Sequence, residues 1–249
     1  MASVSMQDFY KQDLAYIHDT GYGEHARKSA VGILDILSRL SIHDGLIVDL
    51  GCGSGISALE FVQKGYQVLG IDISGAMVAL AKEKVPQAEF RVASLFKVDL
   101  PSCRVVTSIG ECLNYLFDPN NNQKLLQQFF ARVYQTLTTG GVFIFDILEP
   151  GQVTPNNRQR FTEGKDWIVL VEKEENSALS TLTRRIVTLR KSGDQYRRDD
   201  EVHHVQLYRS VDITHRLRQV GFKVQVMRGY GKYKLAPGHT VFVARKPLL

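Results

Sequence analysis

The chain has 249 residues, with 44% hydrophobic and 23% charged side chains and a formal net charge of +5. This composition is typical of an ordinary globular protein and excludes a disordered, collagen-like or disulfide-rich chain. The basic excess is small and its charges are scattered along the chain, which argues against a nucleic-acid partner.

Cysteine usage and the N-terminal residues indicate where the protein works. Cys52, Cys103 and Cys112 are widely spaced and odd in number, which fits neither a disulfide framework nor a zinc site. The first residues lack a basic segment followed by an apolar one, and no apolar run approaches the roughly 20 residues that cross a bilayer. We therefore expect a cytoplasmic protein with no membrane segment and no bound metal.

The first 150 residues alternate between helical and strand patterns. Apolar residues recur at helical spacing in four segments, and short apolar runs lie between these segments. The predicted helices cover residues 24–40, 55–64, 74–85 and 122–137. The predicted strands cover residues 46–50, 67–71, 89–93, 105–109 and 142–147. This alternation predicts an α/β fold with a doubly wound parallel sheet.

The pattern changes after Pro150. Residues 151–166 are polar and predict a loop. Antiparallel strands are expected at residues 167–172, 180–189 and 201–208, with a hairpin turn at 192–194. A helix at 211–220 and strands at 222–227 and 240–244 complete the chain. We predict a single domain over residues 1–249, with a mostly parallel seven-stranded sheet and an antiparallel β insertion, or cap, at 151–210.

A glycine-rich turn follows the first predicted strand. Residues 46–55 have the sequence Leu-Ile-Val-Asp-Leu-Gly-Cys-Gly-Ser-Gly, and the next strand ends in Asp72. Gly51 permits a tight turn, Gly53 lets a ligand approach the backbone, and Gly55 allows the following helix to pack closely. Asp72 is placed to accept hydrogen bonds from the two hydroxyls of a ribose. The spacing therefore predicts a nucleoside site at the carboxyl ends of the strands.

Ile56 and Asp49, at the two ends of the glycine-rich turn, indicate which class of ligand it binds. A dinucleotide site usually has glycine at the sixth position of the turn, where this chain has Ile56. Asp49, just before the turn, would repel a pyrophosphate. A ligand with a cationic end and no phosphate fits better, and S-adenosylmethionine has an ammonium, a sulfonium and a ribose.

The motifs resemble those of class I S-adenosylmethionine-dependent methyltransferases. Residues 48–55 resemble the first motif of that family, and residues 70–74 with Met77 resemble the second. Residues 105–109 and 137–141 are similar to the fourth strand and to the turn before the fifth. The resemblance covers about residues 14–148 and 211–246. It implies a Rossmann-like fold, methyltransferase activity, and S-adenosylmethionine as the cofactor.

The resemblance also implies which residues surround the cofactor. Asp49 would lie near its amino acid end, Asp72 would hold the ribose, and the Ile109 carbonyl would receive the ammonium. Many relatives have an acid or an amide where this chain has Ser94. The implied cofactor-binding residues are Asp49, Gly51, Cys52, Gly53, Asp72, Ile73, Met77, Ser94, Leu95, Ile109 and Gly110.

The acceptor side is less clearly marked. Methyl transfer is an in-line displacement that depends mainly on alignment, so the sequence assigns no catalytic residue. Three segments are expected to cover the cofactor: a polar-aromatic stretch at 16–23 before a helix, which resembles a lid, residues 110–116, and the insertion. The catalytic candidates are His18, Tyr22, Tyr115 and His203. The acceptor-binding candidates are Tyr10, Glu111, Asn114, Arg185 and Arg209.

Several functional hypotheses are compatible with the sequence. A cap after the fifth strand resembles methyltransferases of small molecules, including amino-sugar and glycine-type N-methyltransferases, and implies transfer to N or O of a small acceptor by a monomer or homodimer. Basic pairs in the insertion, which include Arg184 and Arg185, favour an RNA or tRNA methyltransferase instead, although acidic residues interrupt them. A non-catalytic S-adenosylmethionine-binding protein is the third hypothesis.

Overall fold

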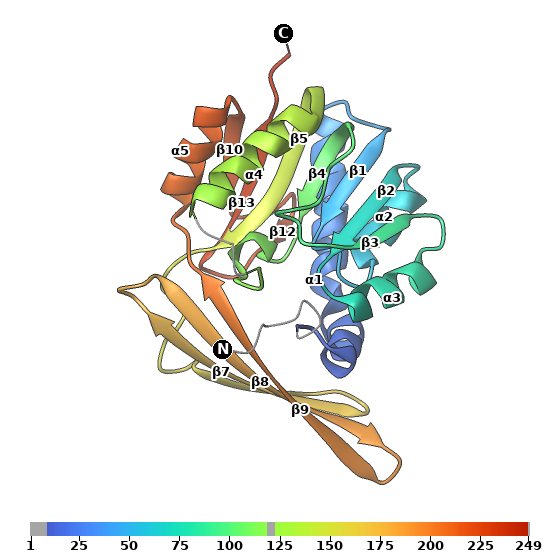
Figure 1. Cartoon of the computed structure of the whole chain (residues 1–249), viewed down its shortest axis with the longest axis vertical. Coiled ribbons are helices and arrows are strands. Elements are labelled where there is room, and N and C mark those ends of the chain that lie inside the picture. The colour runs from blue at the N-terminus through green and yellow to red at the C-terminus, as the bar shows by residue number, and fades with distance from the viewer. Residues whose placement is uncertain (1–8, 119–122, 249) are drawn as a thin grey trace.

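A computed structural model describes residues 9–118 and 123–248, and its centre is a seven-stranded sheet (Figure 1). The strand order is β10-β13-β5-β4-β1-β2-β3. Its strands are β1 (Leu46–Leu50), β2 (Gln67–Asp72), β3 (Glu89–Val92), β4 (Cys103–Ser108), β5 (Leu137–Leu148), β10 (Lys223–Met227) and β13 (His239–Arg245). Strands β1 to β5 pair in parallel, and β13 is antiparallel to both β5 and β10. The predicted mostly parallel, Rossmann-like sheet is confirmed.

Helices cover both faces of this sheet. The helices are α1 (Gln12–Arg39), α2 (Ile56–Gln63), α3 (Gly75–Lys84), α4 (Gln123–Thr136) and α5 (Ser210–Val220). Helices α1, α2 and α3 pack on one face, and α4 and α5 pack on the other (Figure 1). Neighbouring residues of β1 point to opposite faces, so Ile47 joins the first apolar cluster and Val48 joins the second. Residue 122, where the sequence starts the fourth helix, lies outside the described residues.

Strand β5 begins earlier than its sequence predicts. The helix before it was expected to close at Gly140-Gly141, but these glycines lie inside β5. The pairing of β4 with β5 shifts there, from Cys103 opposite Leu137 to Val105 opposite Val142. The extra residues form a bulge, and Gly140 adopts a positive φ of 77° within it.

The cap is a second, four-stranded antiparallel sheet. Its strands are β6 (Gln159–Glu163), β7 (Trp167–Asn176), β8 (Thr181–Ser192) and β9 (Gln195–Gln206). The predicted turn between β8 and β9 is confirmed at Gly193, whose φ is 62°. The predicted loop at 151–166 is wrong over 159–163, because this segment pairs with β7 as β6. It is an exposed edge strand, so its sequence carries no pattern of buried side chains.

Short elements lie outside the two larger sheets. They are the 3-10 turn η1 (Cys112–Asn114), β11 (Gly229–Tyr230) and β12 (Tyr233–Lys234). The segment after η1 reaches β9, where Leu116 N donates to His204 O at 2.9 Å. The cap therefore lies beside the end of the main sheet at which β4 finishes (Figure 1). Within residues 9–118 and 123–248, no helix combines the length and apolar character that a membrane crossing needs.

Helix α1 is longer than predicted. The sequence placed its start at residue 24 and a lid at 16–23, but the structure makes this stretch helical from Gln12 onward. Its two glycines allow close packing instead of a turn. A Cβ on Gly21 would overlap the Trp167 ring of the cap, and a Cβ on Gly23 would lie 2.5 Å from Ile56 Cδ1.

We expect Gly21→Ala to lower the free energy of unfolding by about 1–2 kcal/mol, as overpacking does, although alanine favours helices. The physical reason is the overlap with Trp167, which is buried where the cap packs against α1. Urea denaturation checks this value. In a Trp167→Ala background the same change should become stabilising. Equal destabilisation in both backgrounds would contradict the proposed overlap.

Candidate cofactor and acceptor site

A cavity opens at the carboxyl ends of β1, β2 and β4. Every residue that the resemblance assigned to the cofactor lines it: Asp49, Gly51, Cys52, Gly53, Asp72, Ile73, Met77, Ser94, Leu95, Ile109 and Gly110. Tyr10, His18 and Tyr115 line it too. Parallel strands bring these segments together because their carboxyl ends meet at one edge of the sheet.

The glycine-rich turn leaves room for a ligand. Gly51 and Gly53 adopt φ values of 76° and 53°, which favour glycine. A Cβ on Gly51 would overlap Cys112 Sγ, whereas a Cβ on Gly53 would meet nothing within 4 Å. Gly51 is therefore needed for packing against Cys112. The backbone of Gly53 lines the cavity and has open space beside it. This cradle fits the bare-backbone approach expected for S-adenosylmethionine.

Two buried carboxyl groups lie beside the turn. Asp49 Oδ1 accepts from Thr107 Oγ1 at 2.7 Å, and burial raises the pKa of Asp49 to about 6. Asp72 accepts from Gly53 N and Ser74 N, both at 2.9 Å. Burial raises the pKa of Asp72, while these backbone hydrogen bonds lower it. The pair suits a ligand that presents hydroxyls and a cation, and it disfavours a phosphate.

A third acid, Asp118, lies beside Ser94, the position at which many relatives have an acid or an amide. Ser94 Oγ donates to Asp118 Oδ2 at 2.8 Å, and both residues are buried in the cavity lining. Lys97 Nζ is 3.5 Å from the same carboxylate oxygen. The sequence interpretation missed Asp118 because it follows β4, far from Ser94 along the chain. The signal that could have found Asp118 was Ser94 itself, because a serine at a position that is usually acidic suggests that another segment supplies the acid.

A polar cluster borders the cavity on the cap side. Tyr10 OH lies 3.1 Å from Tyr115 OH, and Arg184 Nη1 donates to Tyr115 OH at 3.1 Å. Arg184, on β8, also forms an ion pair with Glu111. Burial raises the pKa of both tyrosines, so both phenols stay protonated at neutral pH. The cluster can orient an acceptor by hydrogen bonds, but its tyrosines are not bases.

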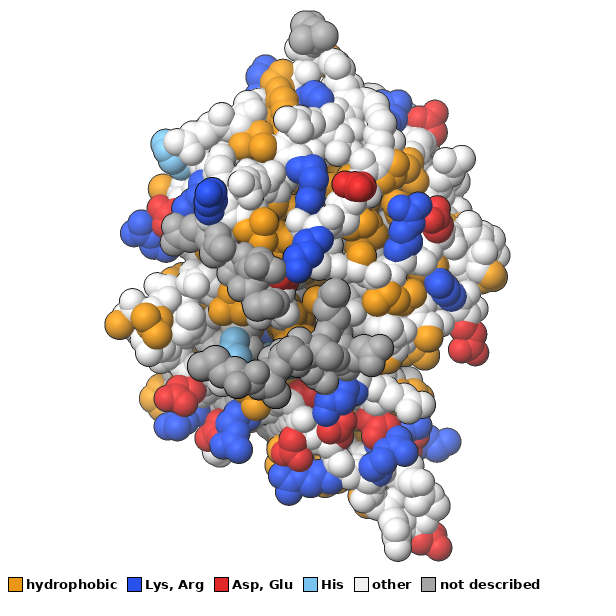
Figure 2. All heavy atoms as spheres, viewed as in Figure 1, with side chains coloured by type: hydrophobic (Ala, Val, Ile, Leu, Met, Phe, Trp, Pro, Cys, Tyr) orange, Lys and Arg blue, Asp and Glu red, His pale blue; other side chains and the backbone are white. Residues whose placement is uncertain are grey.

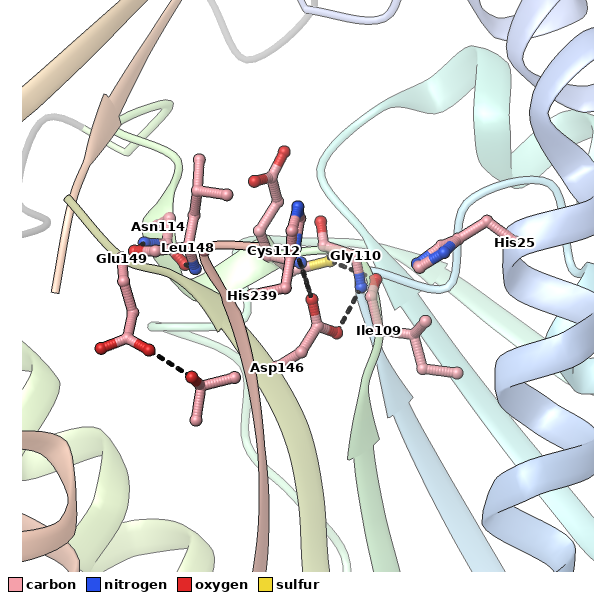
Figure 3. Close-up of polar contacts among 12 residues, drawn as sticks. His25, Ile109, Gly110, Cys112, Asn114, Asp146, Leu148, Glu149 and His239 are labelled. Carbon is pink, nitrogen blue, oxygen red and sulfur yellow. Dashed lines mark hydrogen bonds and ion pairs between the residues drawn. The ribbon is translucent and has the colours of Figure 1, made fainter. Parts of the chain in front are cut away.

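Asp146 holds the loop that carries Glu111. Its carboxylate accepts from Gly110 N at 2.7 Å and from Glu111 N at 3.0 Å, and it also accepts from Tyr230 OH at 2.5 Å. Figure 3 shows Asp146 pointing from β5 toward Gly110 and His239. Burial raises the pKa of Asp146, but the His239 side chain and the hydrogen bonds from Tyr230 and Gly110 N outweigh this effect and lower the pKa. The sequence interpretation missed this residue, which positions the loop without lining the cavity.

Asn114 joins the cap to the main sheet. Its side chain donates to Leu148 O at 3.0 Å and to Gln206 O at 2.6 Å, and it accepts from Leu148 N at 3.0 Å (Figure 3). The buried amide is occupied by backbone groups, so the structure assigns it a structural role in place of the predicted acceptor contact.

Three other candidates lie outside the polar cluster. Arg185 is exposed, 4.0 Å from Glu172, because it faces away from the main sheet. Arg209 is an exposed residue that pairs with Asp212 at 2.8 Å. Tyr22 packs near Trp167, with ring centroids 6.2 Å apart. These side chains do not join Glu111, Tyr115 and Arg184.

The two candidate histidines have different surroundings. His18 lines the cavity, and burial lowers its pKa to about 4, so its ring is neutral at pH 7. Among the described residues, His18 Nδ1 has no hydrogen-bond partner. His203 is buried outside the cavity lining, with Nε2 2.8 Å from Glu201 Oε2. Glu201 also accepts from Tyr10 N, so His203 supports the Tyr10 segment.

Two further side chains line the cavity. His25, which the sequence interpretation missed, lines the cavity from α1, and its Nδ1 lies 3.1 Å from Tyr233 OH. Cys112 Sγ donates to Ile109 O at 3.1 Å, and burial raises the pKa of this thiol well above its ordinary value. Cys112 thus packs as a protonated thiol. Within the described part of the chain, no group of three or more His, Cys, Asp or Glu side chains is arranged to hold a metal.

The sheet order, the glycine-rich turn and the acid at the end of β2 are typical of α/β proteins that bind nucleosides. The family described as a methyltransferase domain matches residues 47–141. A Geobacillus sp. (strain WCH70) protein provisionally named a methyltransferase is 27% identical over 187 residues, covering 72% of this chain and 74% of the relative. These matches support a class I S-adenosylmethionine-dependent methyltransferase, with S-adenosylmethionine as the cofactor.

Solved structures show the same fold. The sugar N-methyltransferase KedS8 from Streptoalloteichus sp. aligns with a TM-score of 0.77 and 18% identity, over 93% of this chain and 92% of that chain. S-adenosylmethionine-bound CalS10, an amino pentose methyltransferase from Micromonospora echinaspora, aligns with a TM-score of 0.74 and 16% identity, over 92% and 96%. These alignments include the cap as well as the main sheet, since they cover nearly the whole chain.

Proposed function

We propose that this methyltransferase transfers the methyl group to a nitrogen or oxygen atom of a small-molecule acceptor held beneath the cap. The observation that carries the proposal is the polar cluster, in which Arg184 of the cap meets Tyr115 of the cavity lining. A sheet that covers this end of the site favours a small acceptor over a folded polymer. The two sugar methyltransferases that share the fold support a small acceptor as well.

The lining residues have distinct proposed roles toward the cofactor. Bound S-adenosylmethionine supplies an electrophilic methyl group on its sulfonium. Asp72 accepts from the ribose hydroxyls, Asp118 accepts from the adenine amino group, and Asp49 and the Ile109 carbonyl face the ammonium. Holding the two reactants in line is the main contribution of the protein, because good alignment can lower the barrier by about 7 kcal/mol or more.

On the acceptor side, Tyr10 and Tyr115 donate or accept hydrogen bonds that orient the reacting atom. His18 is neutral at pH 7, so its unpartnered Nδ1 can accept a hydrogen bond from an amine or hydroxyl. A pKa of about 4 makes this ring a weak base, and we propose it as an orienting group.

The proposal is tested by incubating the protein with S-adenosylmethionine and a panel of small amines and alcohols. Formation of S-adenosylhomocysteine that depends on one acceptor supports it. A parallel reaction with RNA, at increasing salt, tests the polymer hypothesis, since RNA binding should weaken steeply with salt. Methylation of RNA with no turnover of any small acceptor would overturn the proposal.

The cap charges disfavour RNA as the substrate. Its arginines are mostly neutralised by carboxylates, in the pairs Arg184–Glu111, Arg190–Asp166, Arg197–Asp13 and Arg198–Asp200. Figure 2 shows basic and acidic side chains intermingled over the lower part of the molecule, where the cap lies. A phosphate backbone is better bound by an uninterrupted basic surface. Single-domain organisation over 1–249, a cap at 151–210, and a monomer or homodimer remain our predictions.

We expect the affinity for S-adenosylhomocysteine to fall as the pH drops from 7 to 5. Burial raises the pKa of Asp49 to about 6 in the ligand-free protein, and a neighbouring ligand ammonium favours the ionised carboxylate. Binding therefore releases a proton below pH 6, and the affinity should fall toward about ten-fold per pH unit there. Calorimetry at several pH values checks this. Asp49→Asn should bind more weakly with little pH dependence, and an unchanged slope in that variant would contradict the assignment.

A further inference from the structure

We propose that the acceptor carries an anionic group, a carboxylate or a phosphate, which binds between Lys173 and Arg184 on the inner face of the cap. This inference rests on the proposed function and narrows its substrate class. Its first support is the strand pairing, because Lys173 of β7 lies directly opposite Arg184 of β8. Residues directly opposite in an antiparallel pair extend from the same face of the sheet.

That face is turned toward the cavity. Arg184 contacts Glu111 and Tyr115, and Tyr115 lines the cavity. Farther along the same face, Val169 and Ile186 pack in an apolar cluster with α1. The inner face of the cap is thus apolar where it rests on α1 and cationic where it passes the cofactor site.

The two cations have one neighbouring carboxylate, Glu111, between them. Arg184 is paired with Glu111, whereas Lys173 has no ion pair within the described residues and is partly buried. Glu175, the next residue of β7 on this face, accepts from the backbone N–H groups of 151–153. Burial and the Arg184 charge lower the pKa of Lys173, the Glu111 carboxylate opposes this shift, and Arg160 lowers the pKa further.

Two like charges placed directly opposite in a sheet destabilise it, and an anion between them removes that repulsion. Arg184 can present its guanidinium to an oxyanion while keeping its contact with Tyr115, because it has five N–H donors. His239 also lies near, and the Asp146 carboxylate raises its pKa. An acceptor held this way has its anionic end under β7 and β8 and its reacting atom beside Tyr115.

The test uses full-length protein saturated with S-adenosylhomocysteine, so that cofactor binding is confirmed in every sample. Inorganic phosphate and acetate are titrated separately, and binding is followed by NMR shift changes. Lys173→Gln is expected to weaken binding of the preferred anion by about ten-fold, the loss of one charge-assisted contact. Lys191→Gln is the matched control, because Lys191 is an exposed lysine on the outer face of β8.

The outcomes separate this inference from the proposed function. Tighter phosphate binding than acetate binding identifies a phosphorylated acceptor, and the reverse order identifies a carboxylate. The inference is overturned if neither phosphate nor acetate binds, or if Lys173→Gln and Lys191→Gln weaken anion binding equally. In that case methylation of neutral amines or alcohols would leave the proposed function standing. Methylation confined to acceptors with an anionic group, and lost in Lys173→Gln, supports both.

Discussion

Asp72→Ala is expected to weaken binding of S-adenosylhomocysteine by at least about ten-fold, which corresponds to about 1.4 kcal/mol. A hydrogen bond to a charged group contributes about 1.5–3 kcal/mol, and this carboxylate is placed to accept from ribose hydroxyls. It also accepts from Gly53 N and Ser74 N, so its removal leaves two backbone donors of the turn without their acceptor. Isothermal titration calorimetry measures the change.

The controls separate a binding effect from a folding effect. Asp72→Asn keeps one acceptor oxygen and should bind with an affinity between those of the wild type and Asp72→Ala. Asp44, which lies just before β1, is an exposed acid that contacts Arg104. Asp44→Ala should therefore bind S-adenosylhomocysteine with the affinity of the wild type. A folded Asp72→Ala variant with unchanged affinity would show that Asp72 does not hold the cofactor.

Arg184→Ala is expected to lower the free energy of unfolding by about 3 kcal/mol and to impair methyl transfer. Removing one partner of a buried ion pair leaves an uncompensated charge, which typically destabilises by about 3–5 kcal/mol. The side chains of Arg184 and Glu111 are only 16% and 10% exposed, and Glu111 Oε2 has no partner among the described residues. Urea denaturation and the rate of S-adenosylhomocysteine formation measure the two effects.

A second variant tests this explanation. Adding Glu111→Gln to Arg184→Ala removes the stranded carboxylate, so the double variant should regain part of the lost stability. Arg198→Ala, which breaks an exposed pair with Asp200 on the same cap, should leave the melting temperature unchanged. If the double variant is no more stable than Arg184→Ala, the buried charge is not the cause.

The cofactor half of the site was accessible from the sequence because its signals are local. The turn at Gly51 and Gly53 and the acid at Asp72 lie within a short span, and chain connectivity alone brings them to one sheet edge. Residues reached by longer paths escaped this reasoning. Asp118 replaces the missing acid at Ser94 from a different loop, and Asp146 acts on the backbone of Gly110.

The cap shows a second limit of prediction from the sequence, which concerns the side chains that face the cofactor. Alternation along a strand requires the neighbours His203 and His204 to point to opposite faces, and the structure buries His203 and exposes His204. The same rule separates Arg184 from Arg185, but it does not say which of them faces the cofactor. Strand register and the placement of the cap decide that, and they bring Arg184 to Glu111.

The sequence by itself determined the class of fold, the cofactor and the residues of the glycine-rich turn, because short-range spacing and hydrophobic periodicity carry that information. It also indicated an antiparallel insertion after β5. Only the tertiary structure decided how α1 and the cap meet at Gly21 and Trp167, and which cap side chain contacts Glu111 and Tyr115. Those contacts join segments far apart in the chain, so they depend on packing and register that no local pattern records.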